Sequence, residues 1–225
     1  MIKLRLRIGG GDFELNAQTI ASFADKAPGF TVAGDLYVSA DIKELPEGLI
    51  VAGSLNLQGT SIKVLPQRLT VGRTLYLRGT GIKTVPPEVL VGGSVDLRGL
   101  DFFLPEGFTV GGSIDLTGAP TASLPTGLCV GGSLHLNGSG ITVLPQGLKV
   151  GGSLYLRDTA ISVLPDALCL GGSLDLSGTR VTTLPRGLNL GGNLYIEDLE
   201  IESLPADMVV AGFIYRGAGS VRLTE

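Results

Sequence analysis

The chain repeats a unit of 19 or 20 residues along most of its length, and this repeat limits the possible folds more than any other feature. In each repeat, a Val or Leu precedes a pair of small residues, usually Gly-Gly. These apolar markers are Val32, Val51, Val71, Val91, Val110, Val130, Val150, Leu170, Leu190 and Val210. A unit this short cannot bury its apolar side chains alone, so the units must stack as the coils of a solenoid.

The apolar positions of the unit predict its local structure. We number each repeat from the first of the two small residues. Positions 4 and 6 are aliphatic, as in Leu55 and Leu57, which is typical of a short strand with one face inward. Positions 11, 14 and 18 are also apolar, and a Pro near position 15 recurs in nine repeats. This Pro excludes a regular helix and favours extended or polyproline-like backbone.

Glycine accounts for 35 of the 225 residues, and its placement also favours a coil with tight corners. Gly does not occur at every third position, which excludes a collagen-like helix. A disordered chain is excluded because 44% of the residues are hydrophobic and the net charge is only −4. Most glycines fall at positions 1, 2, 8 and 17, where we expect sharp turns.

The pattern L-x-L-x-x-T-x-I-x-x-L-P resembles the leucine-rich repeat, in particular the short bacterial class known from secreted effectors. The resemblance implies a leucine-rich-repeat superhelix of about ten coils, with a parallel β-sheet on the concave face and turns, extended or 3-10 segments on the convex face. The family's first Leu is Gly or Ala here, and its Asn is Thr or Ser, as in Thr60 and Thr159. We therefore expect a ladder of hydroxyls. A four-sided β-helix of pentapeptide type is the alternative, although the apolar positions are unevenly spaced for it.

The ends of the chain depart from the repeat. In residues 1–31, the alternation on either side of Gly9-Gly10-Gly11 predicts a hairpin, and a short helix is expected from Asn16 to Pro28-Gly29. These residues would form an N-terminal cap on the solenoid of residues 32–225. Arg216 replaces an aliphatic residue in the last repeat and Arg222 follows, which suggests a modest C-terminal cap and a monomer rather than an oligomer. A further domain or a second copy over the last coil is the alternative.

The outward strand positions carry the residue types of a binding surface. All five tyrosines and the single histidine occur at position 5. Tyr and Arg dominate binding hot spots, although Tyr also favours strands, and Asp beside Arg can be cross-strand charge pairing. From positions 5 and 7 we predict these partner-binding residues: Tyr37, Tyr76, Asp96, Asp115, His135, Tyr155, Asp175, Tyr195, Tyr215, Arg78, Arg98 and Arg157.

The leading functional hypothesis is a non-enzymatic module that binds a protein partner through the concave strand face. The alternative is a structural solenoid that assembles through its coil ends. No catalytic, metal or cofactor site is expected, because His135 is the only histidine. A relay of Asp115 and His135 with Ser113 or Ser133 would use serines that occur in most repeats. By resemblance, the setting would be bacterial or phage, and the protein effector-like.

Charge and hydropathy narrow the partners and the compartment. A pI near 5.1 gives no basic field for nucleic acid, and no apolar run is long enough to span a membrane. The N-terminus lacks a signal-peptide pattern. Cys129 and Cys169 are two coils apart, about 9–10 Å, so we expect them reduced and the protein cytoplasmic, with delivery into a host cell as the alternative. A stripe of Lys43, Lys63 and Lys83 could contact an acidic partner or be ordinary surface.

Overall fold

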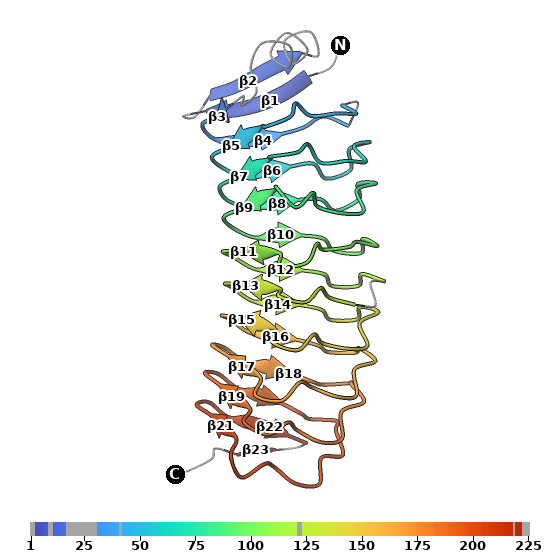
Figure 1. The fold of residues 1–225 in the computed structure, drawn as a ribbon, viewed down its shortest axis with the longest axis vertical. Helices are drawn as coiled ribbons and strands as arrows, with labels where there is room; N and C mark the ends of the chain where they lie inside the picture. The colour runs from blue at the N-terminus through green and yellow to red at the C-terminus, as the bar shows by residue number, and fades with distance from the viewer. Residues whose placement is uncertain are drawn as a thin grey trace.

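The fold is a β-solenoid in which coils of about 20 residues stack along one axis (Figure 1). The computed structural model describes residues 3–8, 11–16, 31–40, 42–120, 123–217 and 219–221. The predicted repeat solenoid of about ten coils is confirmed, and the described residues contain no helix. The described residues accordingly form no helix that is long and apolar enough to span a membrane.

Each repeat contributes one short strand to each of two parallel sheets. Sheet A is built from repeat positions 4 and 5. Its repeat strands are β4 (Asp35–Tyr37), β6 (Leu55–Asn56), β8 (Leu75–Tyr76), β10 (Val95–Asp96), β12 (Ile114–Asp115), β14 (Leu134–His135), β16 (Leu154–Tyr155), β18 (Leu174–Asp175), β20 (Leu194–Tyr195) and β22 (Ile214–Arg216). Sheet A is the strand row that the alternation of positions 4 and 6 predicts.

Sheet B is a second parallel sheet, built from positions 19 and 20. Its strands are β3 (Thr31–Val32), β5 (Ile50–Val51), β7 (Thr70–Val71), β9 (Leu90–Val91), β11 (Thr109–Val110), β13 (Cys129–Val130), β15 (Lys149–Val150), β17 (Cys169–Leu170), β19 (Asn189–Leu190) and β21 (Val209–Val210). Away from sheet A, the sequence predicted turns, extended or 3-10 segments and no second sheet. The two-residue strands are too short to show a periodicity of their own, and only the pairing of neighbouring coils makes them a sheet.

Side chains from both sheets and from the connecting segments form one core along the stack. Within the second coil, Leu55, Leu57, Ile62 and Leu69 are each 0% exposed. The equivalent apolar residues of most other coils are also buried, and together they form one continuous hydrophobic cluster. The parallel register keeps equivalent residues side by side, as in the pairing of His135 with Tyr155. Each repeat position therefore becomes a row along the solenoid.

The hydroxyl ladder forms at position 3 rather than at the Thr and Ser of position 9. The hydroxyls of Thr60 and Thr159 donate to carbonyls three residues earlier in their own coils, at 2.8 and 2.7 Å. The bonds between coils come from the corner: the Ser133 Oγ accepts the backbone N–H of Ser153 at 3.0 Å, and the Ser153 Oγ accepts that of Ser173 at 2.9 Å. The position-9 hydroxyls of Thr60 and Thr159 thus bond within their coils, and the ladder between coils is at position 3 instead.

Antiparallel strands close sheet A at both ends. β1 (Lys3–Ile8) pairs with β2 (Gly11–Asn16) as the alternation predicts, and β1 also pairs with β4. At the other end, β23 (Gly219–Val221) pairs with β22. The helix expected after Asn16 and the side chain of Arg222 lie outside the described residues. Between these ends the coils follow a nearly straight axis (Figure 1), so we call the outward side of sheet A the strand face.

Candidate functional site

The strand face brings all twelve predicted residues onto one side of the molecule. Nine lie at position 5, within the strands of sheet A, and three arginines lie at position 7, where each coil turns after its strand. Tyr37 in the first coil is 46% exposed, whereas Asp96 is 6% exposed. The other residues at position 5 are half-buried, with their neighbours in the row covering part of each side chain.

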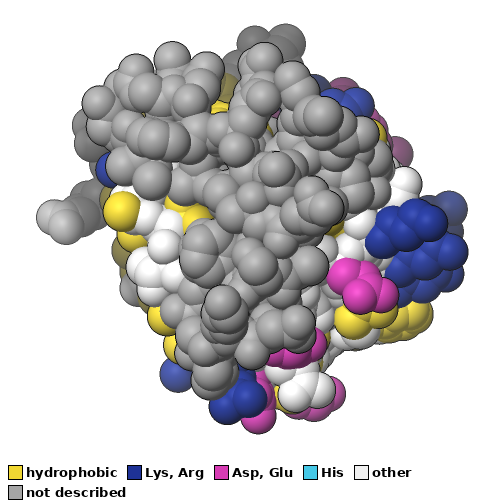
Figure 2. Space-filling model, turned by 90° about the horizontal axis from the view of Figure 1, so that it is seen from above, with side chains coloured by type: hydrophobic (Ala, Val, Ile, Leu, Met, Phe, Trp, Pro, Cys, Tyr) yellow, Lys and Arg dark blue, Asp and Glu magenta, His cyan; other side chains and the backbone are white. Residues whose placement is uncertain are grey.

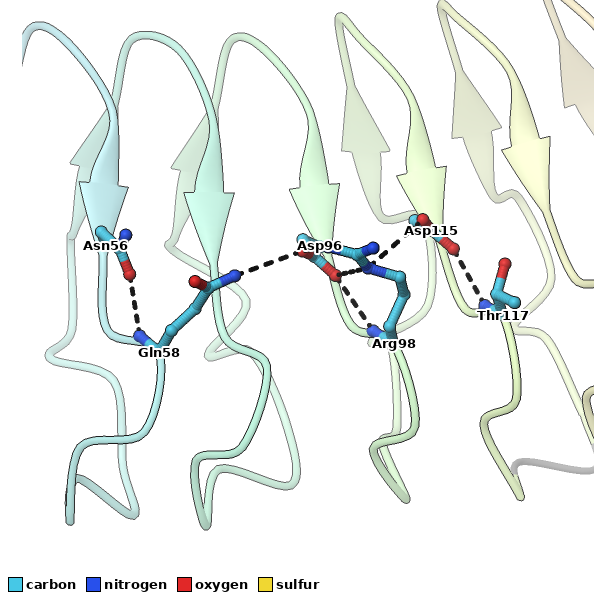
Figure 3. Close-up of polar contacts among 6 residues, drawn as sticks. All are labelled: Asn56, Gln58, Asp96, Arg98, Asp115 and Thr117. Carbon is cyan, nitrogen blue, oxygen red and sulfur yellow. Dashed lines mark hydrogen bonds and ion pairs between the residues drawn. The ribbon is translucent and has the colours of Figure 1, made fainter.

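Asp96 and Arg98 form the polar centre of the strand face (Figure 3). The Arg98 guanidinium donates through Nε and Nη2 to the two carboxylate oxygens of Asp96, at 2.9 and 2.6 Å. The Gln58 amide donates to the same carboxylate from two coils away, at 3.5 Å. Arg98 Nε also lies 3.6 Å from a carboxylate oxygen of Asp115. This guanidinium is therefore shared by two acids.

The surroundings of Asp96 favour its ionised form. Burial alone would raise the pKa of this carboxyl. The hydrogen bonds from the Arg98 side chain and backbone, and the charges of Arg98 and Arg78, outweigh burial and lower the pKa below its usual value. The same hydrogen bond raises the pKa of Arg98. The pair is thus a stable ion pair at neutral pH.

The polar residues at position 5 also hold the turn that follows each strand. The Asp115 carboxylate accepts the backbone N–H of Thr117 at 3.0 Å, and the Asp175 carboxylate accepts that of Ser177 at 3.0 Å. Asp175 also lies 3.4 Å from Arg157 Nε. Side chains that bond the backbone two residues on are a known turn-forming device. The acids and their paired arginines therefore have a structural role that the sequence left open.

The rings at position 5 stack along the solenoid axis. The centroids of His135 and Tyr155 are 4.7 Å apart, with 15° between the ring planes. Tyr195 and Tyr215 are also 4.7 Å apart, with 5° between the planes. Because this separation matches the spacing of neighbouring strands, the rings cover one another's faces. A partner on the strand face would meet ring edges and hydroxyl groups.

One aromatic residue at the end of this row is not among the residues predicted from the sequence. Phe213 is 43% exposed, and its ring centroid lies 6.4 Å from that of Tyr215. It occupies position 3, where most other repeats carry Ser. The Asn193 side-chain amide, at the same position one coil earlier, donates to the Tyr195 hydroxyl at 3.0 Å. Reading position 3 down the repeats would have revealed both departures.

Ser113 and Ser133, the serines of the possible catalytic relay, belong to the row of position-3 hydroxyls that bond between coils. The Ser113 Oγ accepts the backbone N–H of Ser133 at 2.9 Å, as the Ser133 Oγ does for Ser153. Within the described part of the chain, no three His, Cys, Asp or Glu residues are grouped as metal ligands would be. Cys129 and Cys169 are both free thiols, as expected.

These features define the protein as a repeat β-solenoid with parallel strands and coils of about 20 residues. No protein-family model matches the chain, and neither the curated proteins nor the solved structures gave a match.

Proposed function

We propose that this protein is a non-enzymatic interaction module that binds a protein partner through the strand face. The observation that carries the proposal is the row of tyrosine and histidine rings along sheet A, in which every Tyr of the chain lies. Tyr combines a large contact area with a polar group and is enriched in binding hot spots. The uninterrupted hydrogen bonding between coils holds these rings in place before binding, which lowers the entropy lost in a complex.

The contacts divide the twelve predicted residues into two groups. Tyr37, Tyr76, Tyr155, Tyr195, Tyr215, His135 and Arg78 are the residues that we propose contact the partner. Asp96, Asp115, Asp175, Arg98 and Arg157 are engaged with one another or with turns. We propose that these five shape the strand face and contribute less to affinity.

We further propose that the repeat is related to the short bacterial leucine-rich repeat and that the protein acts in the cytoplasm, in a bacterial or phage setting and with an effector-like role. The 20-residue period and the recurring Leu-Pro pair support the relationship. We propose no cofactor, nucleic acid or membrane as a ligand. Delivery into a host cell is the alternative for the compartment.

The test is partner capture by a variant carrying Tyr155→Ala and Tyr195→Ala. With partners identified by pull-down from the source cell, the double substitution is expected to weaken capture at least about 30-fold, since truncating a hot-spot residue costs about 2 kcal/mol. The matched control is Thr109→Ala with Asn189→Ala, two exposed residues on the outward side of sheet B. Circular dichroism checks that both variants fold. Unchanged capture by the tyrosine variant would contradict the proposal.

End-to-end assembly is the competing function, and the chain ends disfavour it. Each end of sheet A is an antiparallel pair, whereas sheet B ends in the parallel strands β3 and β21, so a second solenoid could continue only one of the two parallel sheets. Light scattering that shows chains growing in length with protein concentration would favour assembly over the binding module.

A further inference from the structure

A second surface runs along the solenoid away from the strand face. In each coil the residue before the Leu-Pro or Val-Pro pair is exposed, and in most coils so is the residue before that. We call these exposed residues the outer edge. The bridge between Thr84 and Phe103 shows that equivalent residues of neighbouring coils are aligned there. The outer edge is therefore a continuous row.

Apolar side chains gather on the outer edge. Of the nine large hydrophobic side chains that are exposed in the described residues, four lie on this row. They are Val64 at 72%, Phe103 at 61%, Val143 at 65% and Val163 at 72% exposed. The solenoid needs none of them, because Thr or Ser occupies the same position in other coils. Apolar residues concentrated on one exposed row are typical of an interface.

The two ends of the outer edge carry opposite charges. Lys43, Lys63 and Lys83 occupy it in the first three coils together with Glu44, which leaves a net positive charge, and Glu202 occupies it in the ninth. Viewed from the N-terminal end of the stack, Lys and Arg side chains gather along one side of the molecule (Figure 2). Each end is also hollowed. Lys43 and Lys63 line an open hollow of about 640 Å³ together with Glu44 and Glu47, and Glu200 and Glu202 line one of about 880 Å³ together with Arg186 and Arg216.

Existing ion pairs leave these charges available. The Lys83–Asp101 and Arg68–Glu88 pairs are both 3.9 Å long, between side chains that are more than half exposed. Such surface pairs are worth little and exchange readily. Lys63 and Glu202 are both exposed, at opposite ends of the row. A surface with opposite net charges at its two ends and apolar residues along it is complementary to itself when inverted.

In place of the monomer expected from the charged last repeat, we propose that two copies of this chain associate through their outer edges, side by side and antiparallel. A two-fold axis between the fifth and sixth coils places the second coil of each copy against the ninth coil of the other. Lys63 then faces Glu202, and Arg68 faces Asp207, which occupies the same repeat position seven coils later. Each contact occurs twice, as an isologous interface requires.

The same axis pairs the fourth coil with the seventh, which sets Phe103 against Val163 near the centre. Apolar residues at the centre with charged residues toward the ends match the usual anatomy of an interface. A parallel arrangement would instead oppose lysine to lysine. The strand face takes no part in this contact and stays free in both copies.

Sedimentation velocity across protein concentration and salt tests the proposal. The unmodified protein is expected to form a dimer whose dissociation constant rises with ionic strength, since the charges are at the solvent-exposed ends. Lys63→Glu alone and Glu202→Lys alone should each raise the dissociation constant about tenfold or more, because each places like charges at both ends. The double variant Lys63→Glu with Glu202→Lys should recover the dimer.

Lys149→Glu is the matched control, because it makes the same change at an exposed residue of sheet B. It should leave the dissociation constant unchanged. The proposal is overturned if the unmodified protein is a monomer at every concentration, or if the charge-swapped double variant remains as weak as the single ones. Partner capture measured on Lys63→Glu separates this outcome from the proposed function, since that variant keeps the whole strand face.

Discussion

Glycine is required in this solenoid for two different physical reasons. At Gly151, on the corner between the sheets, a Cβ atom would lie 2.3 Å from the carbonyl oxygen of Gly131 in the preceding coil. At Gly147, near the turn after the Leu-Pro pair, φ is +70° and no atom would lie within 4 Å of a Cβ. Ala167 occupies the equivalent position two residues after Pro165, with φ of 55°. The corner glycines are therefore required by space and the turn glycines only by backbone conformation.

Substituting these two glycines should separate the two effects. Gly147→Ala is expected to lower the free energy of unfolding by about 1 kcal/mol, the cost of a left-handed residue with a Cβ. Gly151→Ala should lower it by about 3 kcal/mol or more, because the backbones of two coils must move apart. Chemical denaturation of both variants measures the difference. Equal losses would show that the corner can relax.

At the scale of the strand and its turn, polar residues of sheet A that lie on the strand face also hold the turn that follows the strand. Asp96 ends its strand, accepts the backbone N–H of Arg98 at 3.2 Å and binds the Arg98 guanidinium. Asn56, at the same position two coils earlier, accepts the backbone N–H of Gln58 at 2.9 Å. An amide can thus replace the carboxylate in holding the turn, but it cannot provide the charge.

The lowered pKa of Asp96 predicts how stability depends on pH. A carboxyl whose pKa is lower in the folded state stabilises the fold above its unfolded pKa, about 3.9, and this contribution is lost as pH falls through the folded pKa. Asp96→Asn should therefore be less stable than the unmodified protein at pH 7. The difference in free energy of unfolding between the two should shrink on acidification below about pH 4.

Denaturation at a series of pH values measures this difference, with Asp166→Asn as the control. Asp166 is an exposed acid outside the strand face, so its substitution should change stability little at either pH. A gap between Asp96→Asn and the unmodified protein that stays constant down to pH 2 would refute the ionic role of Asp96.

At the scale of the whole molecule, each coil contacts mainly the coils on either side. The strands of both sheets pair only with the equivalent strands of adjacent coils, apart from the antiparallel strands at the ends. Stability in such a stack is close to a sum of coil and interface contributions. The length of the solenoid is therefore adjustable in steps of one complete repeat.

Deleting one complete repeat tests this modularity. Removing residues 131–150 joins Val130 to Gly151, which restores the Val-Gly-Gly junction of the repeat. The shortened protein should fold and be about 4.8 Å shorter. Removing residues 131–140 alone should disrupt the fold, since it shifts every later inward residue out of register. Small-angle scattering gives the length and circular dichroism the fold. An unfolded full-repeat deletion would contradict the modular description.

Part of the candidate site could be predicted from the sequence. The row of Tyr and His at position 5 was visible because strand alternation assigns that position an outward side chain whatever the neighbouring coil contains. The sequence did not show which residues of the strand face are free and which are engaged with one another. Whether Arg98 is free or bound to Asp96 and Asp115 depends on side-chain distances between coils, which no repeat pattern specifies.

The fold, like the candidate site, could be predicted from the sequence only in part. The sequence by itself determined the solenoid, the period of the coil and the inward positions, because burying apolar side chains at a fixed period constrains every repeat alike. Only the tertiary structure decided that positions 19 and 20 form a second sheet, that position 3 rather than position 9 bonds between coils, and that β23 closes the last strand. These features depend on hydrogen bonds between coils, whose partners are fixed by how closely two backbones approach in space.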